Sequence, residues 1–318
     1  LTLDLDKFLE IDAEKLDLLV KVDELRAVKN KVSKEIPTMS NEERPSKIAE
    51  MKKLWADLEL LEEKQKEVEV LWKDMYYKIP NVLDETASVW NTDEDNIVVE
   101  TFLEPTSFDF EPRSHWDIGE AKWWIDVEKG SEVSWARFWY LKWDLVLLQF
   151  ALMNYAMSKL VAKGFNPILP PVLVREKAMF GTGFLADQTD GLYRVNPDDD
   201  DLHLVGTSEV PVTSYHSWET LDLEKPQMYV AYSPCFRKEA GSAGKDMKGI
   251  LRGHQFDKIE MVSFCKPEES QKLHDFMVSV EEDVWQWLWI PYNKMNVCSW
   301  DLGNPAMKKY DIEAWMPG

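Results

Sequence analysis

The sequence predicts an α+β protein, in which an antiparallel hairpin of two long helices precedes a domain built on an antiparallel sheet with flanking helices. Two observations predict this fold. Residues 12–36 and 48–75 carry apolar side chains at near-heptad spacing, which is typical of paired amphipathic helices. Residues 228–264 contain two segments of alternating pattern on either side of a glycine-containing loop, which indicates a long β-hairpin.

The first of the two helices carries a run of basic residues. Pro37 ends this helix, and a turn over 40–45 leads to the second, which ends before Pro80. Between Arg26 and Lys34 the charged residues are all basic: Arg26, Lys29, Lys31 and Lys34. The run is either a solvated helix face or a stripe that follows an RNA backbone, and the pattern alone does not separate the two.

A linker, an apolar helix and a strand are predicted between the arm and the hairpin. Residues 79–105 are rich in Pro, Asn and Asp and predict a linker. Residues 145–163 are apolar nearly all round, which predicts a helix that is buried on both sides, and Gly164 then caps it. A strand is expected after Pro170 and Pro171. The predicted divisions are an arm at 1–78, the linker at 79–105 and a larger domain at 106–318.

Composition excludes several classes of protein. The net charge of −21 argues against a broadly basic surface, so any contact with RNA is local. The three cysteines form no CxxC pair, which excludes a zinc cluster or a disulfide framework and indicates reduced thiols in the cytoplasm. The longest apolar run, at 145–153, is broken by Gln149 and is too short to span a bilayer, so we expect no membrane association.

The ends of the β-hairpin carry charges that a packed sheet does not need. Arg237, Glu239 and Arg252 flank the loop, and these charges favour a polar ligand. The loop is not a P-loop, since no Ser or Thr follows its Gly-Lys pair, but two guanidinium groups can hold phosphate bidentately. Phe256, on the same strand face as Glu260, can stack on a base. The alternative is a surface hairpin with solvated charges.

A second candidate site lies at the end of the segment LHLVGTSEVPV. Its Thr207, Ser208 and Glu209 form a triplet that is common at helix N-termini, and this structural role is the more frequent one for such a pattern. A carboxylate there is also a suitable partner for an ammonium group.

Four segments together resemble the seryl-tRNA synthetase family of class II aminoacyl-tRNA synthetases. FRKEAGSAGKDMKGILRGHQFDKIE resembles motif 2, and the TSE triplet matches the TxE loop. The apolar helix with GFNPILPPVLV is similar to motif 1, which forms the homodimer interface. RAVKNKVSKEI resembles the first helix of the coiled-coil arm that binds serine tRNA. The resemblance implies ATP-dependent activation of L-serine to seryl adenylate and transfer to serine tRNA, and it leaves open selenocysteine tRNA as a second substrate.

The resemblance also implies a role for individual residues. The catalytic residues are Arg237, Glu239 and Arg252. The serine-binding residues are Thr207, Ser208, Glu209, Arg237 and Glu260. The ATP-binding residues are Arg237, Lys238, Glu239, Gly253 and Phe256. The tRNA-binding residues are Arg26, Lys29, Asn30, Lys31 and Lys34. We assign no metal ligand.

The sequence departs from the family at both ends and at Gly253, where the family has a larger residue. The short helical segment that usually precedes the arm is absent, and motif 3 is expected beyond Gly318. Because motif 3 holds the terminal phosphates of ATP and helps to hold Mg²⁺, we expect the chain as given to be a fragment that binds ATP poorly or not at all. Two rival functions are a paralogue that does not charge tRNA and a coiled-coil interaction protein with a degenerate globular domain.

Tryptophan replaces glycine at several places where the family has glycine. The chain holds 15 Trp and only 13 Gly, against roughly 22 Gly at average usage. The affected positions are Trp90, Trp123, Trp135, Trp143, Trp289 and Trp300. Tryptophan provides neither the positive φ nor the close packing of glycine. Our hypothesis is that these are UGA codons, translated here as Trp but read as Gly in the genetic code of the source.

Overall fold

The computed structural model describes residues 3–40, 43–89, 92–184, 191–239 and 249–317. The chain divides into two compact units, Leu1–Asn81 and Val82–Gly318. Each unit has its own buried residues and is described by itself.

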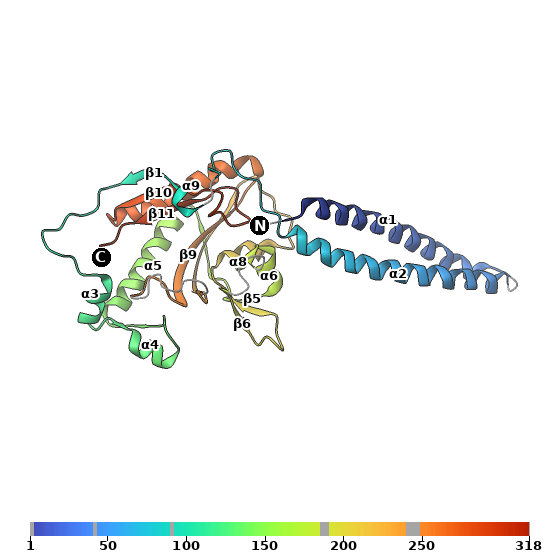
Figure 1. Cartoon of the computed structure of the whole chain (residues 1–318), viewed down its shortest axis with the longest axis horizontal. Coiled ribbons are helices and arrows are strands. Elements are labelled where there is room, and N and C mark those ends of the chain that lie inside the picture. The colour runs from blue at the N-terminus through green and yellow to red at the C-terminus, as the bar shows by residue number, and fades with distance from the viewer. Residues whose placement is uncertain (1–2, 41–42, 90–91, 185–190, 240–248, 318) are drawn as a thin grey trace. The chain divides into compact units, whose positions relative to one another are not determined.

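The first unit is a hairpin of two helices, α1 (Leu5–Glu35) and α2 (Arg44–Tyr76), with a 3-10 turn (Ile36–Thr38) at its tip (Figure 1). Asp4 caps α1 by accepting a hydrogen bond from the Lys7 N–H. The predicted apolar stripes meet between the helices, where each helix contributes three buried residues. These are Leu18, Val22 and Val32 from α1, and Met51, Leu58 and Val68 from α2. The predicted two-helix arm is confirmed.

The second unit is organised on the predicted β-hairpin. Strands β8 (Gln227–Phe236) and β9 (Gln255–Phe264) pair antiparallel, with Gln227 opposite Phe264 and Phe236 opposite Gln255. Strand β4 (Asn166–Ile168) adds to β8 in parallel. Helices α5 (Asp144–Ala162) and α9 (Ser270–Trp287) pack on this sheet through a cluster of Leu160, Phe165, Val230 and Val280.

Three smaller sheets and several short helices complete this unit. Strands β5 (Leu173–Arg175), β7 (Leu202–Leu204) and β6 (Tyr193–Val195) form one sheet, flanked by α6 (Glu176–Gly181) and α8 (Glu209–Thr213). The second sheet consists of β1 (Ile97–Phe102), β10 (Tyr292–Asn296) and β11 (Tyr310–Ala314). The third pairs β2 (Ile125–Asp126) with β3 (Tyr140–Leu141), near α3 (His115–Ala121) and α4 (Val127–Val133).

One strand lies where we expected a linker. The segment Ile97–Phe102 pairs with β10, with Phe102 opposite Tyr292. Its β-branched run IVVETF has the composition of a strand, which the Asn and Asp residues before it obscured. The segment 79–105 therefore includes an edge strand of the second unit.

The prediction that the apolar helix is buried on both sides is wrong. Leu160 is the buried residue of α5, whereas Leu147 is 68% exposed and Phe150 is 63% exposed. One side of α5 faces β8 and β9, and its apolar composition does not reveal that the other side lacks a cover. By length and composition alone α5 also meets the criteria for a membrane-crossing helix, a test that core helices of soluble proteins pass too. The C-terminal cap is confirmed, since Gly164 has a φ of +100°.

Three of the six tryptophans at glycine positions have a left-handed backbone. The φ values are 59° at Trp123, 56° at Trp143 and 56° at Trp289, and their side chains are 73%, 69% and 77% exposed. Trp135 and Trp300 are also exposed, but their φ values are not in this region. Trp90 lies outside the described residues. These three tryptophans destabilise the folded protein in two ways. Their large apolar side chains lie in solvent, and their backbone conformation is one that favours glycine.

Candidate active site

The site lies on one face of the β8–β9 hairpin, near the end of the strands that carries Phe236 and Gln255. Phe256, Lys258 and Glu260 alternate on β9, so they point to the same face of the sheet. The residues opposite them on β8 are Cys235, Ser233 and Ala231, which are small and buried and leave room above the sheet. The segment 206–209, which follows β7, meets this face through hydrogen bonds to β9.

Arg237 follows β8 and is held at two points. Its Nε donates to the Gly206 carbonyl at 3.1 Å, and its guanidinium carbon lies 5.4 Å from the centre of the Phe256 ring. A Cβ at position 206 would lie 3.4 Å from the Arg237 Cγ, so a residue without a side chain suits this close approach. Arg237 is exposed, and among the described residues its two terminal nitrogens have no hydrogen-bond partner, which suits a bidentate contact with phosphate or carboxylate.

Thr207, Lys258 and Glu260 form a polar group beside Arg237. The Thr207 hydroxyl donates to Glu260 Oε2 at 2.7 Å and accepts a hydrogen bond from Lys258 Nζ at 3.0 Å. Lys258 is also ion-paired with Glu260. Sequence analysis missed Lys258. The signal was its position between Phe256 and Glu260 in the alternating pattern, but nothing in the sequence indicates that Thr207 meets it.

Glu209 begins α8 and adds a second carboxylate to the same region. Desolvation by the surrounding protein raises the pKa of Glu209, and the Glu260 carboxylate adds to this, while Lys258 and Arg237 oppose it. Ser208, by contrast, is completely buried at the N-cap of α8. Its Oγ has no hydrogen-bond partner among the described residues, so its predicted contact with substrate would have to come from its backbone.

The residues after Arg237 begin the loop of the hairpin. Glu239 accepts a hydrogen bond from Arg252 at 3.0 Å, and its φ of 52° is unusual for a residue with a side chain. Such backbone strain concentrates at functional sites. Lys238 Nζ lies 5.8 Å from the centre of the Tyr193 ring. The loop residues 240–248 lie outside the described residues.

Gly253 is packed against an aromatic ring. A Cβ at this position would lie 2.0 Å from a ring atom of Trp139 and 3.1 Å from the Arg137 carbonyl. Trp139 therefore fills the space that a larger residue would need, so glycine suits this position.

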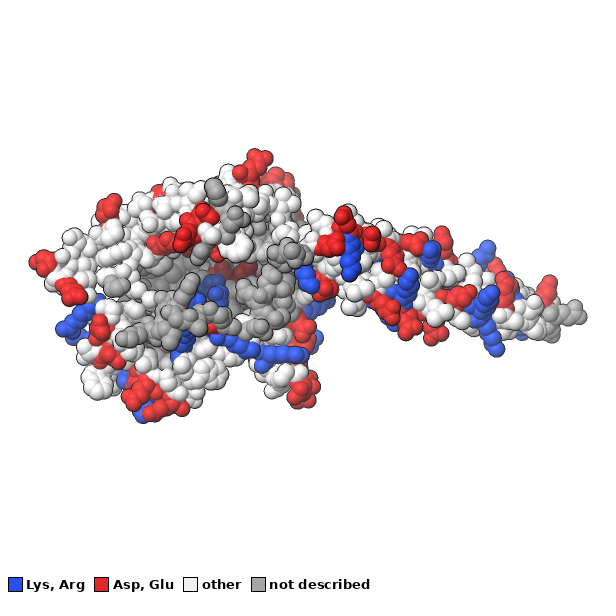
Figure 2. All heavy atoms as spheres, in the orientation of Figure 1, with Lys and Arg blue, Asp and Glu red and all other residues white. Residues whose placement is uncertain are grey.

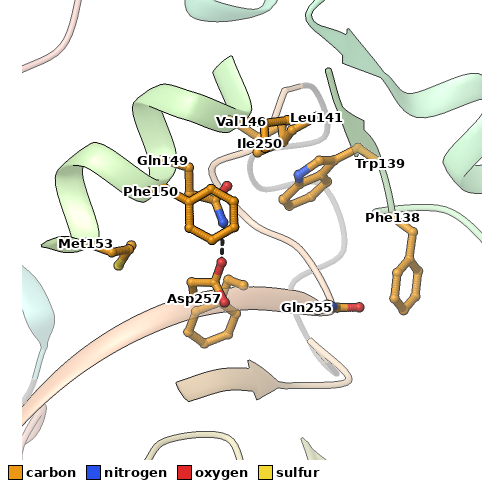
Figure 3. A pocket seen from close by; sticks show the side chains of 11 residues that line it. Phe138, Trp139, Leu141, Val146, Gln149, Phe150, Met153, Ile250, Gln255 and Asp257 are labelled. Carbon is orange, nitrogen blue, oxygen red and sulfur yellow. Dashed lines mark hydrogen bonds between the residues drawn. The ribbon is translucent and has the colours of Figure 1, made fainter. Parts of the chain in front are cut away.

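A cavity of about 390 Å³ borders the start of β9, at Gln255, Phe256 and Asp257 (Figure 3). Its lining includes Phe138 and Trp139 together with Phe150 and Gln149 of α5. Asp257 points into it and accepts hydrogen bonds from the side chains of Gln149 and Tyr232, the latter at 3.0 Å. These contacts connect α5 directly to the strand that carries Phe256 and Lys258.

The predicted tRNA-binding residues of the arm are exposed, but they differ in whether they form an ion pair. Arg26 pairs with Glu62 of α2 at 2.8 Å, which neutralises part of its charge. Lys29, Asn30, Lys31 and Lys34 are exposed, and the three lysines form no ion pair within the described residues. Acidic and basic side chains are interspersed over the arm on the face shown in Figure 2. Of the five predicted residues, these three lysines therefore keep the positive charge that could follow an RNA backbone.

Both units match family models. Residues 1–83 match the seryl-tRNA synthetase N-terminal domain, and residues 193–318 match the core domain of class II tRNA synthetases for G, H, P, S and T. The serine--tRNA ligase of Rhodococcus opacus is 42% identical over 98% of this chain and 74% of its own length. The chain belongs to the seryl-tRNA synthetase family. The serine--tRNA ligase of Thermodesulfovibrio yellowstonii is 39% identical over 99% of this chain and 76% of its own length.

Solved structures of the seryl-tRNA synthetase family share the fold. The enzyme from Pyrococcus horikoshii complexed with ATP has a TM-score of 0.85 and 34% identity, over 98% of this chain and 75% of that chain. The cytoplasmic enzyme from Naegleria fowleri in complex with AMP has a TM-score of 0.78 and 32% identity, over 98% and 72% of the two chains. The predicted family and α+β fold class are confirmed.

Proposed function

We propose that this site activates L-serine with ATP and that the protein transfers the seryl group to serine tRNA. The convergence of Arg237, Thr207, Glu209 and Glu260 from three separate segments is the observation that carries the proposal. It places a guanidinium suited to phosphate next to carboxylates suited to an ammonium group, which is the charge distribution of an amino acid lying beside a nucleotide phosphate.

Each residue of the site has its own proposed role in the reaction. Arg237 holds the α-phosphate and the serine carboxylate together, so that the carboxylate attacks the phosphorus in line and pyrophosphate leaves. Phe256 stacks on adenine, and the pair of Glu239 and Arg252 orders the start of the loop. The Thr207 backbone and the Glu209 side chain hold the amino group of serine, and Glu260 completes the serine pocket. Little proton transfer is required, so His254, which hydrogen-bonds the Arg237 carbonyl, has no acid–base role.

Magnesium is expected to accompany ATP. Among the described residues, no group of three or more His, Cys, Asp or Glu is arranged to hold a metal ion. The donor set of the described site therefore does not fit a resident magnesium ion, and no step is assigned to one. The ion would arrive on the phosphates of the nucleotide.

A non-hydrolysable seryl adenylate analogue tests the proposed function directly. We expect seryl sulfamoyl adenosine to raise the melting temperature, because it engages the carboxylates and Arg237 at once. The alanyl analogue, which lacks the hydroxyl, is the control and should raise it less. A melting temperature that responds to neither analogue would favour an interaction protein, and an equal response to both would favour a paralogue with another substrate.

The arm is proposed to bind tRNA through its unpaired lysines. Replacing Lys29, Lys31 and Lys34 with Gln should weaken binding of serine tRNA. It should also reduce the slope of the logarithm of the binding constant against the logarithm of salt concentration by about 2 to 3, because each phosphate contact that is lost no longer releases a counterion. The rate of adenylate formation should not change. Binding is measured over a range of salt concentrations, with selenocysteine tRNA as a second ligand.

The matched control removes the same number of charges from lysines that already have partners. Lys64, Lys73 and Lys78 pair with Glu14, Glu69 and Asp74. Their replacement by Gln should leave the salt slope nearly unchanged. A loss of adenylate formation in the first triple variant would contradict the assignment of the arm.

The exposed face of α5 is proposed to be covered by a second copy of the chain, in a cytoplasmic homodimer. The opposite side of the helix packs in the protein core through Met157 and Leu160, which argues against insertion into a bilayer. Leu147→Asp or Leu148→Asp, at two exposed residues away from the cavity, should weaken the dimer at least about tenfold, because each places a charge in an apolar interface. Molecular mass by light scattering over a dilution series checks this. Val70→Asp, at an exposed apolar residue of α2, is the control, and an unchanged dimer in the α5 variants would contradict the proposal.

A further inference from the structure

The Thr207 hydroxyl has no hydrogen-bonding capacity to spare. A hydroxyl offers one donor and two acceptor positions. Here it donates to Glu260 Oε2 at 2.7 Å, and it accepts from Lys258 Nζ at 3.0 Å and from the Glu209 N–H at 3.2 Å. It can therefore contact a substrate only by giving up one of these bonds, and Thr207 is 1% exposed.

Lys258 closes this arrangement into a ring. Its ammonium pairs with the same Glu260 Oε2 that receives the Thr207 hydroxyl, so the three side chains contact one another in turn. The side chain of Lys258 is 33% exposed and that of Glu260 is 20% exposed. A pair at this depth is screened less by solvent and salt than a surface pair.

The ring fixes how Glu260 can meet a ligand. Its contacts with Thr207 and Lys258 both engage Oε2, which leaves Oε1 as the oxygen for an incoming group. Lys258 also lies near Glu209, where its positive charge opposes the rise in the pKa of Glu209 that burial and the Glu260 carboxylate cause.

We propose that Lys258 is a positioning residue that sets amino-acid specificity, by holding the Glu260 carboxylate oriented so that one oxygen reads the hydroxyl of the substrate. The inference rests on the proposed function. Lys258 acts through Glu260 and Thr207 and does not itself touch the reacting atoms. An amino acid of similar size without a hydroxyl leaves the oriented Glu260 oxygen unpaired, so it binds less well.

The test is pyrophosphate exchange by the full-length protein with L-serine and L-alanine. Lys258→Met keeps the length of the side chain and removes its charge. We expect the KM for serine to rise about 10- to 100-fold and the serine-to-alanine ratio of kcat/KM to fall at least about tenfold. The KM for ATP should stay within about twofold, because Arg237 and Phe256 are unchanged. Lys258→Arg keeps the charge and should restore most of the serine affinity.

A double-mutant cycle separates this role from a structural one. If Lys258 acts through Glu260, the variant that combines Lys258→Met with Glu260→Gln should lose no more than Glu260→Gln alone. Lys272→Met, at an exposed lysine of α9, is the control. Additive losses, equal increases in the KM for serine and for ATP, or an unchanged KM for serine would each overturn the inference. If the parent protein shows no serine-dependent exchange, the proposed function fails, and the inference fails with it.

Discussion

Arg237→Ala is expected to reduce adenylate formation by about a thousandfold, as measured by serine-dependent pyrophosphate exchange in the full-length protein. Arg237 is held between the Gly206 carbonyl and the Phe256 ring, so its guanidinium is already oriented before ligands bind. Loss of one preorganised donor to developing charge typically costs 10² to 10³ in rate. Here a single side chain is proposed to hold both reacting groups, so the loss should lie at the upper end of this range.

Two further variants sharpen this experiment. Arg237→Lys keeps the charge but lacks the planar fork, so it should recover only a small part of the activity. Arg194→Ala, at an exposed residue of β6, removes an arginine from a neighbouring surface and should leave exchange unchanged. Exchange at a near-normal rate in Arg237→Ala would remove the role assigned to this residue.

The combined replacement of Trp123, Trp143 and Trp289 by glycine is expected to stabilise the protein by about 2 kcal/mol. A left-handed backbone costs a residue with a side chain about 1–2 kcal/mol, and glycine avoids this cost. The greater freedom of glycine in the unfolded chain offsets about 0.4–1 kcal/mol at each site. Trp143 is the most strained of the three, because its φ of 56° and ψ of −131° suit glycine almost alone. Denaturant unfolding measures the change.

The chain itself provides a matched control. Trp135 and Trp300 are exposed and belong to the same set of expected glycine positions, but their φ values are not left-handed. Replacing these two by glycine relieves no backbone strain and should not stabilise the protein. A triple variant no more stable than the parent would contradict the strain argument. The hypothesis of UGA recoding has its own test: mass spectrometry of the protein from its source should find glycine at these five positions and at position 90, and tryptophan there would refute it.

Local patterns predicted the parts of this protein that depend on neighbouring residues. The apolar stripes of α1 and α2, the strand alternation in β8 and β9 and the cap at Gly164 all agree with the structure. Each depends on spacing along one or two adjacent segments, which is where periodicity is informative. The roles of Arg237, Glu239, Arg252 and Phe256 came from the resemblance to the family, and the structure brings these residues to one end of the hairpin.

The environment of α5 could not be predicted from its own residues. An apolar helix has the same sequence pattern whether a second layer covers it or not, so the expected burial on both sides was wrong. The strand Ile97–Phe102 was missed for a related reason, since its pairing partner β10 is distant in the sequence.

By itself the sequence determined the family, the helical arm, the β8–β9 hairpin and which charged residues lie at its end. Only the tertiary structure decided that Thr207 meets Lys258 and Glu260, that one face of α5 is uncovered, and that three of the tryptophans have a left-handed backbone. The physical reason is that spacing along a strand fixes the face on which a side chain lies. What that side chain contacts depends on segments that arrive from elsewhere in the chain, as Thr207 does across 51 residues to reach Lys258.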